Sequence, residues 1–262
     1  MVDSESTDGS AEYLQGLFAS NKIHQFISEP DNNQANGWNK ALLMAKGTII
    51  KKLIDDDVHA IEAIRKCRDF MLQNKGVDIC ISNMLEGDLA NPSWVGSASR
   101  LSYYLQWKNG VTKTFTFSDV TMLQRKSSLG LLGLYDTQFK MIDWEYSLRV
   151  TYLRAKIAYY TGYNSMSVPT PGNVSSSATK RTFRREEQIG KIKYEYSGDQ
   201  SDISFYSKTK VWIGTTYYKL KNKIVQPETR NTPVESELME IYAAYYQKLE
   251  EQNKKDSWEF IF

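Results

Sequence analysis

Apolar residues recur at helical spacing in three segments in the first third of the chain. The spacing predicts a first helix over residues 11–28 and a second over 38–54. A loop rich in Asn, Pro and Gly separates these two helices at 29–37. A third helix follows, with an apolar stripe made of Ile61, Ile64, Cys67 and Met71. Three aspartates precede it, at 55–57, and acidic residues of this kind are typical of a helix N-terminus.

Alternating residues and turn signals predict two β elements in the middle of the chain. Val77, Ile79 and Ile81 occupy every second position, which favours a short strand. The clearest hairpin pattern covers 101–117, where an Asn-Gly pair separates two segments rich in aromatic and β-branched residues. Asn-Gly is preferred in tight hairpin turns because both residues tolerate a positive φ.

The second half of the chain is predicted to form a long helix, a linker, a basic sheet and a final helix. Residues 137–161 place apolar side chains every three or four positions. Residues 163–179 are rich in Ser, Thr and Pro, a composition typical of a linker. Alternation within 180–223 predicts antiparallel strands. A Thr-Pro-Val-Glu capping box begins the last helix, at 233–252.

These elements predict an α+β fold. It has an N-terminal helical part, a central β-hairpin, a long amphipathic helix and a C-terminal antiparallel basic sheet with a terminal helix. Helices and strands that come in separate runs argue against an alternating, parallel sheet. We expect a disordered acidic tail at 1–10, then a helical part with the inserted hairpin at 11–162 and a linker at 163–179. The basic sheet with its capped helix is expected at 180–255, and an apolar tail at 256–262.

Composition limits the class of protein. The 262 residues are 41% hydrophobic and 24% charged, which is ordinary for a soluble chain able to bury a core. Two cysteines suit a reducing compartment better than a disulfide framework. No apolar run reaches the length of a membrane span, and the acidic N-terminus lacks the features of a signal peptide. We therefore expect a soluble protein, intracellular or within a particle assembled in a cell.

Candidate catalytic groups are few. Asp55, His59 and Glu62 would share one helical face and could bind a divalent metal; the alternative is an acidic helix N-terminus that complements the helix dipole. Asp143 and Glu145 are two positions apart, so a helix would point them in different directions. No nucleophile elbow, Walker motif or dinucleotide-binding motif is present. The sequence predicts no enzyme, no cofactor and no metal.

Residues 179–223 concentrate charge and aromatic side chains. They include eleven Lys or Arg, five Asp or Glu and eight aromatic residues, a net charge of +6 against +2 for the whole chain. Three interpretations fit: contact with nucleic acid, a Lys-rich edge that resists aggregation, or a Tyr-rich sheet packed on a neighbouring subunit. Candidate contacts with nucleic acid or an acidic partner are Arg181, Arg184, Arg185, Lys191, Lys193, Lys208, Lys210, Lys219 and Lys221. Candidate stacking or interface residues are Tyr194, Tyr196, Trp212, Tyr217 and Tyr218.

The last seven residues form an apolar tail. A free chain end with this much apolar surface either folds back onto its own core or docks on a partner. We favour docking, because the charged segment before the tail would let it extend from the domain. The predicted docking residues are Trp258, Phe260 and Phe262.

A family resemblance covers about residues 152–220. YLRAKIAYYTG at 152–162 is followed by a Ser-rich linker, then by REEQIGKIKYEYSGDQSD at 185–202 and FYSKTKVWIGTTYYKL at 205–220. This order resembles the C-terminal part of head–tail adaptor proteins, the connector or neck proteins of tailed phages. The matching positions are Ile189, Gly190, Lys191, Ile192 and Tyr196, then Gly214, Tyr217 or Tyr218, and Leu220. The resemblance implies a non-enzymatic protein that forms a ring on the portal, with a lumen facing the exiting DNA.

The sequence alone therefore predicts a structural assembly protein of a virus or phage particle. It would form a homo-oligomer and contact other particle proteins, such as a portal or tail component, and nucleic acid. Its expected location is the virion, and the host cytoplasm during assembly. The alternative is a free nucleic-acid-binding protein that uses the basic, aromatic sheet.

Overall fold

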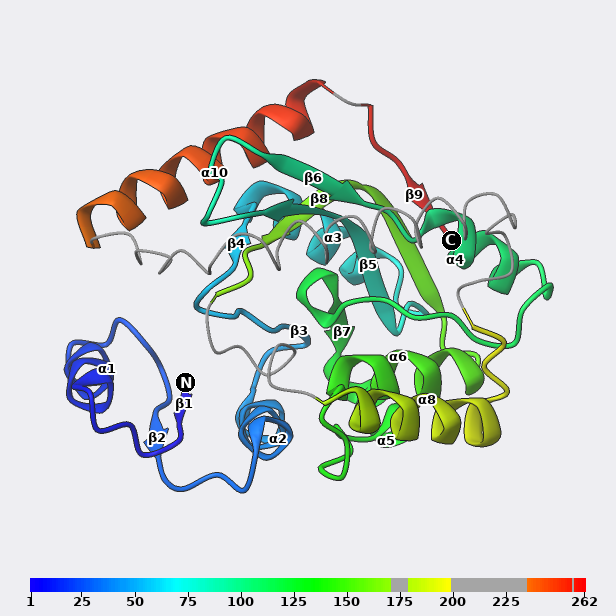
Figure 1. Cartoon of the computed structure of the whole chain (residues 1–262), viewed down its shortest axis with the longest axis horizontal. Coiled ribbons are helices and arrows are strands. Elements are labelled where there is room, and N and C mark those ends of the chain that lie inside the picture. Colours follow the sequence, from blue (N-terminus) through cyan, green and yellow to red (C-terminus); the bar gives the residue numbers. More distant parts are fainter. Residues whose placement is uncertain (171–178, 199–234, 256) are drawn as a thin grey trace, which may run out of the picture.

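The computed structural model describes residues 1–170, 179–198, 235–255 and 257–262 (Figure 1). A seven-stranded sheet with both parallel and antiparallel pairs is flanked by helices, and a separate two-stranded sheet lies near the N-terminus. The predicted mixture of helices and strands is therefore confirmed, but its arrangement differs from the prediction.

The elements have the following bounds. The α-helices are α1 (Ser10–Ala19), α2 (Gln34–Met44), α3 (Ile61–Gln73), α4 (Leu101–Lys108), α5 (Leu129–Leu132), α6 (Ile142–Tyr152), α8 (Lys180–Tyr194) and α10 (Glu235–Lys255). The strands are β1 (Val2–Asp3), β2 (Ile27–Ser28), β3 (Ile49–Lys51), β4 (Val58–His59), β5 (Ile79–Gly87), β6 (Val95–Ala98), β7 (Leu123–Arg125), β8 (Ile157–Ser167) and β9 (Phe260–Ile261). The larger sheet has the order β3-β7-β5-β8-β4, with β6 paired to β5 and β9 paired to β8.

The centre of the sheet is the parallel pair β5–β8. Its register runs from Ile79 opposite Ile157 to Glu86 opposite Ser167, with an irregularity around Asn83. Side chains reinforce the pair at that irregularity, because the Tyr159 hydroxyl lies 2.6 Å from the Asn83 amide oxygen. A parallel pair requires a long crossover, here residues 88–156, which carry α4, α5 and α6.

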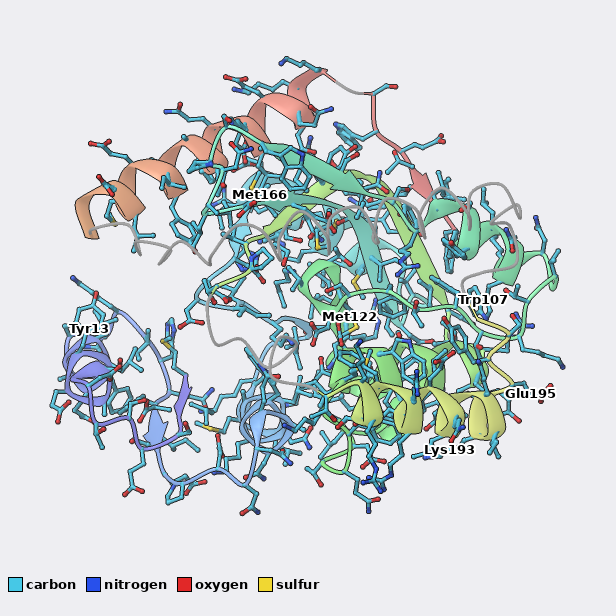
Figure 2. All side chains as sticks on the ribbon, in the orientation of Figure 1. Tyr13, Trp107, Met122, Met166, Lys193 and Glu195 are labelled. Atoms are coloured by element: carbon cyan, nitrogen blue, oxygen red, sulfur yellow. The ribbon has the colours of Figure 1, made fainter. Side chains whose placement is uncertain are left out.

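The two central strands are buried on both faces. Ile79, Ile81 and Tyr159 face a core shared with α2, α4 and α6. Cys80 and Tyr160, the alternate residues, face a second core built with α3 and α10. The sequence of a strand that is covered on both faces is mostly apolar and does not alternate, because neither face contacts water. Figure 2 shows Met122 and Met166, one from each core, within the interior of the molecule.

The hairpin predicted over 101–117 is wrong. Residues 101–108 form α4, and its buried side chains are Tyr104 and Trp107, three positions apart on one helical face. The Tyr104 hydroxyl donates to the Ile157 carbonyl at 2.9 Å, which fixes α4 against β8. The Asn-Gly pair ends this helix: Gly110 has a φ of 76°, the left-handed conformation common just past a helix C-terminus. The same dipeptide thus serves as a helix stop here.

The long helix predicted over 137–161 is also wrong, because it divides into a helix and a strand. α6 ends at Tyr152, and Arg154 adopts a left-handed φ of 56°. The run that follows, Ile157 onward, then pairs with β5. Aromatic and β-branched residues favour strands, and a fully buried apolar run cannot be assigned by periodicity alone.

The C-terminal basic sheet is not found where the structure describes this region, since residues 180–194 form α8. The Thr179 hydroxyl caps the helix by accepting from the Thr182 N–H at 3.2 Å. Glu187 and Lys191 form an ion pair at 2.7 Å, one turn apart, which supports a helix rather than a strand. The predicted contact residues Lys208, Lys210, Trp212, Tyr217, Tyr218, Lys219 and Lys221 lie outside the described residues.

The remaining helices follow the prediction to different degrees. α3 is confirmed, with Cys67 and Met71 buried on its stripe, and α10 confirms the final helix. The first two predicted helices are too long: α1 ends at Ala19 and α2 at Met44, and short strands follow each. The N-terminus is not an acidic disordered tail, because β1 pairs in parallel with β2. Among the described helices, none combines the length and apolar content needed to cross a bilayer.

The apolar tail packs on its own chain. β9 is antiparallel to β8, with Phe260 opposite Tyr160. The Phe260 ring stacks on that of Phe70 from α3, with centroids 4.1 Å apart. Of the two alternatives considered for the tail, the structure shows the one in which it folds back onto the core.

We expect Phe260→Ala to lower the free energy of unfolding by about 2 kcal/mol, because it removes ring contacts with Phe70 and Tyr160. Urea denaturation followed by circular dichroism measures this change. Phe262→Ala, at a ring that is 52% exposed, is the matched control and should cost less than about 1 kcal/mol. Equal effects of the two substitutions would contradict the packing of β9.

Candidate active site

A cleft rich in carboxylates lies beside the ends of β3 and β8 and the start of α6. Its volume is about 600 Å³. Five aspartates line it: Asp55, Asp56, Asp57, Asp119 and Asp143. Three cations, Lys52, Arg100 and Lys140, also line it. The cleft thus brings together acidic groups from three distant parts of the sequence.

The first acidic group is the turn at 55–57, which joins β3 to β4. The Asp57 carboxylate accepts the Val168 N–H at 3.0 Å, and the Asp56 carboxylate accepts the Thr170 hydroxyl at 2.8 Å. These bonds tie the turn to the chain just after β8. Burial raises the pKa of Asp57 to about 6, and the neighbouring Asp56 charge acts in the same direction. Asp55 is exposed.

The second acidic group is Asp143, in the first turn of α6. Its carboxylate accepts the Trp144 N–H at 2.8 Å. Burial raises the pKa of Asp143 to about 6, and the Asp119 charge adds to this effect while Lys52 opposes it. A carboxyl group with such a pKa can accept a proton near neutral pH.

Asp119 and Lys52 form a buried ion pair beside Asp143. The Lys52 ammonium donates to the Asp119 carboxylate, which also accepts the Tyr135 hydroxyl at 3.2 Å. The same ammonium lies 4.4 Å from the centre of the Trp38 ring. One lysine therefore lies beside two aspartates, so the raised pKa of Asp143 comes first from burial and then from the Asp119 charge.

Glu186 of α8 holds the start of α6 in place. It is 4% exposed, and its two carboxylate oxygens accept the N–H groups of Lys140 and Met141 at 2.9 and 3.0 Å. A carboxylate at a helix N-terminus satisfies unpaired N–H groups and interacts favourably with the helix dipole. α8 thereby positions Asp143, although it contributes no carboxylate to the cleft.

The other end of α8 is fixed by a buried network. The Tyr194 hydroxyl donates to the Glu145 carboxylate, which also pairs with Arg149 at 3.0 Å. Arg149 in turn donates to the Leu134 carbonyl at 2.6 Å. Asp143 and Glu145 therefore do point to different surroundings, as their spacing predicts.

The predicted contact residues of α8 divide between its two faces. Arg181, Arg184, Arg185, Lys191 and Lys193 are all exposed. Tyr194 and Tyr196 are buried against α6, so their rings contact their own chain. Figure 2 shows Lys193 and Glu195 at the outer end of this helix.

The proposed arrangement of Asp55, His59 and Glu62 on one helical face is wrong. Asp55 lies in a turn, His59 in β4 and Glu62 in α3. Burial and the nearby Lys51 lower the pKa of His59 to about 4, so the ring is neutral at physiological pH. Within the described part of the chain, no group of three His, Cys, Asp or Glu is placed to hold a metal by itself.

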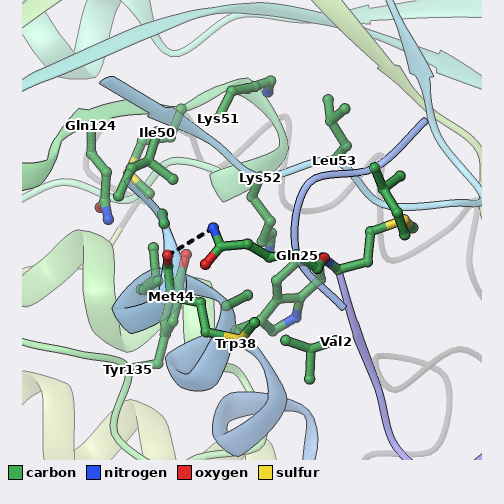
Figure 3. A pocket seen from close by; sticks show the side chains of 16 residues that line it. Val2, Gln25, Trp38, Met44, Ile50, Lys51, Lys52, Leu53, Gln124 and Tyr135 are labelled. Atoms are coloured by element: carbon green, nitrogen blue, oxygen red, sulfur yellow. Dashed lines mark hydrogen bonds between the residues drawn. The ribbon is translucent and has the colours of Figure 1, made fainter. Parts of the chain in front are cut away.

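A second cavity, of about 480 Å³, separates β1 from the edge strand β3 (Figure 3). Its walls are mostly apolar and include Val2, Trp38 and Ile50. The Gln25 side-chain amide donates a hydrogen bond to the Met44 carbonyl at 3.0 Å. No carboxylate occurs among the described residues that line it. The carboxylates that line the cleft are absent from this cavity. We take the cleft as the candidate active site because it alone contains Asp119 and Asp143 among the cavities named above.

Comparison with known proteins identifies the class. Residues 1–132 match the sequence model of glycosyl transferase family 2, which is half of the chain. The chain therefore belongs to glycosyl transferase family 2. No curated protein sequence matches the chain at a significant level.

One solved structure supports the fold, and two others are less similar. TarS of S. aureus, residues 1–349 in complex with UDP-GlcNAc, is similar with a TM-score of 0.54 and 15% identity, covering 96% of this chain and 71% of TarS 1–349. TarS 1–349 alone gives a TM-score of 0.46 at 15% identity, covering 97% and 81%. The mannosyltransferase PcManGT of Pyrobaculum calidifontis, with GDP-Man and Mn²⁺, gives 0.43 at 12% identity, covering 95% and 73%. Of these three, the first is close enough to show a shared fold.

Family membership overturns the functional prediction made from the sequence. The resemblance to head–tail adaptors is wrong, and with it the non-enzymatic role, the virion location and the portal or tail partners. The nucleic-acid-binding alternative is not supported either. The quoted motif around Ile189 and Gly190 lies in α8, where Gly190 permits close packing on α6.

One signal in the sequence points to the cleft. Two pairs of apolar residues, Ile49-Ile50 and Leu53-Ile54, precede the three aspartates, and the same aspartates also fit the start of a helix. For Asp143, the only nearby carboxylate in the sequence is Glu145. Its true partners, Asp119 and Lys52, come from other elements and share no local pattern with it.

Glu186→Ala should lower the free energy of unfolding by about 1–3 kcal/mol, because two N–H groups before α6 lose their acceptor. Chemical denaturation measures the loss. Glu187→Ala removes the exposed neighbour and its ion pair with Lys191, so it should cost less than about 0.5 kcal/mol. If the two variants were equally stable, Glu186 would not hold α6.

Proposed function

We propose that this chain transfers a sugar from a nucleoside-diphosphate donor to a hydroxyl of an acceptor. The observation that carries the proposal is the carboxylate cleft, where Asp143 faces the same hollow as Asp55, Asp56 and Asp57, which we call the aspartate turn. Membership of glycosyl transferase family 2 supports this reaction class. TarS, which shares the fold, was solved with UDP-GlcNAc, and this supports a nucleotide sugar as the donor.

The aspartate turn is suited to a donor that arrives with a divalent cation. Five carboxylates against three cations would repel a bare diphosphate. Mg²⁺ takes one or two carboxylates and fills its other positions with phosphate oxygens and water. Two carboxylates are therefore enough to bind such a cation when the donor is present. Asp55 and Asp57 would be these two ligands. The bound cation would neutralise the charge that develops on the diphosphate leaving group.

Asp143 is suited to act as the general base. The acceptor oxygen attacks the anomeric carbon of the donor sugar, and the bond from that carbon to the diphosphate oxygen breaks. The proton of the acceptor hydroxyl passes to the Asp143 carboxylate, and the nucleoside diphosphate leaves with the bonding electrons. The raised pKa of Asp143 suits this role, because proton transfer is most efficient when the base titrates near the working pH.

Donor binding and turnover test the proposal. UDP- and GDP-sugars, with Mg²⁺ or Mn²⁺, should raise the melting temperature, and the responsive donor should release nucleoside diphosphate on incubation. Asp143→Asn should lower the release rate about 10²- to 10⁴-fold while the melting shift remains. Asp69→Asn, at an exposed residue of α3, is the control and should leave both unchanged. No stabilisation by any donor would overturn the proposed function.

The pH dependence of stability should follow the raised pKa of Asp143. The folded state keeps the proton to about pH 6 but the unfolded chain loses it near pH 4, so the free energy of unfolding falls between these values. Asp143→Asn removes this fall and should stabilise the protein by on the order of 2–3 kcal/mol at pH 7. Denaturation of both proteins at about pH 4 and 7 measures the difference, which should vanish at the lower pH. An equal difference at both pH values would contradict the shifted pKa.

A further inference from the structure

An aromatic groove adjoins the carboxylate cleft on the side of Asp143. Its volume is about 350 Å³, and its walls include Met141, Trp144, Phe183, Glu187, Lys191 and Tyr196. The first three also line the cleft, so the two hollows meet along these side chains. No residue of the aspartate turn lines the groove. The groove therefore adjoins the cleft at Trp144, the residue next to the proposed base in α6, and does not adjoin it at residues 55–57.

The Trp144 ring is held in a fixed orientation within this groove. It follows Asp143 directly in α6, and it packs edge-on against Tyr196, with ring centroids 5.4 Å apart at 89°. A Cβ atom at Gly190 would lie 2.5 Å from the indole, so α8 passes as close to the ring as a glycine allows. The indole is half-buried, which leaves part of it accessible from the groove.

Polar groups at the groove match a ligand with hydroxyls. The Glu187 and Lys191 side chains are each about half exposed, at 49% and 48%, and pair at 2.7 Å. The Glu187 carboxylate can accept hydrogen bonds, and the Lys191 ammonium can donate them. A sugar ring offers an apolar C–H face to an aromatic side chain and hydroxyls to such charged groups. Aromatic walls with a few polar groups are typical of small-ligand sites.

We propose that this groove is the acceptor subsite, where a saccharide stacks on Trp144 and Phe183 and presents a hydroxyl to Asp143. This inference rests on the proposed sugar transfer and names its acceptor class. A nucleobase of the donor could also stack on an aromatic ring. The groove is favoured for the acceptor because it meets the cleft through residues of α6 and α8, beside the base.

Saturation-transfer NMR with chitotriose, cellotriose and maltotriose, each measured first without and then with UDP and Mg²⁺, tests the subsite by binding alone. At least one trisaccharide should bind the wild-type protein, and Trp144→Ala should weaken that binding at least tenfold. Trp94→Ala, at a tryptophan that is 46% exposed, is the matched control and should change it less than twofold. Phe183→Ala is a second variant, because Trp144 also packs on the cluster of Leu148, Tyr194 and Tyr196.

The outcomes distinguish failure of the proposed acceptor subsite from failure of the proposed sugar transfer. Absence of binding by all three trisaccharides, or unchanged binding in both groove variants, would overturn the subsite. Displacement of the saccharide by UDP would overturn it too, because the groove would then hold the nucleobase. Saccharide binding that depends on Trp144, without transfer from any nucleotide sugar, would support the subsite and contradict the proposed function.

Discussion

The parallel pairing of β5 with β8 is the constraint on which the rest of the structure depends. Parallel strands cannot be joined by a tight turn, so residues 88–156 must cross from the end of one strand to the start of the other. That crossover carries both Asp119 and α6 into position over one face of the sheet. The end of β8 then leads to Val168, whose N–H binds Asp57. The cleft forms where these segments meet.

The cleft concentrates like charges, which is unfavourable for folding. Asp119 and Asp143 both interact with Lys52, and burial raises the pKa of Asp143. The fold offsets this cost with contacts that come from far along the chain. Glu186, more than forty positions after Met141, satisfies the N–H groups before α6 and so keeps Asp143 in place. Such a balance is common at active sites, where stability is exchanged for reactive groups.

α8 has two separate roles on its two faces. The inner face carries Glu186, Gly190 and Tyr194, which fix α6 and bring the helix close to Trp144. The outer face carries the arginines and lysines, which are exposed. The basic and aromatic residues between 180 and 194 thus belong to a helix that supports the cleft. Within these residues, their coincidence reflects helical amphipathicity and does not mark a nucleic-acid surface.

The sequence by itself determined the elements that depend on local signals: the apolar stripe of α3 and the capping box before α10 both predicted helices that exist. It could not determine the secondary structure of segments whose pattern is compatible with two kinds of element. Asn-Gly ends α4 instead of turning a hairpin, and the buried run at Ile157 is a strand instead of a helix. Only the tertiary structure brought Asp57, Asp119 and Asp143 to one cleft, because their proximity depends on strand pairing between distant segments. Local periodicity carries no information about such long-range contacts.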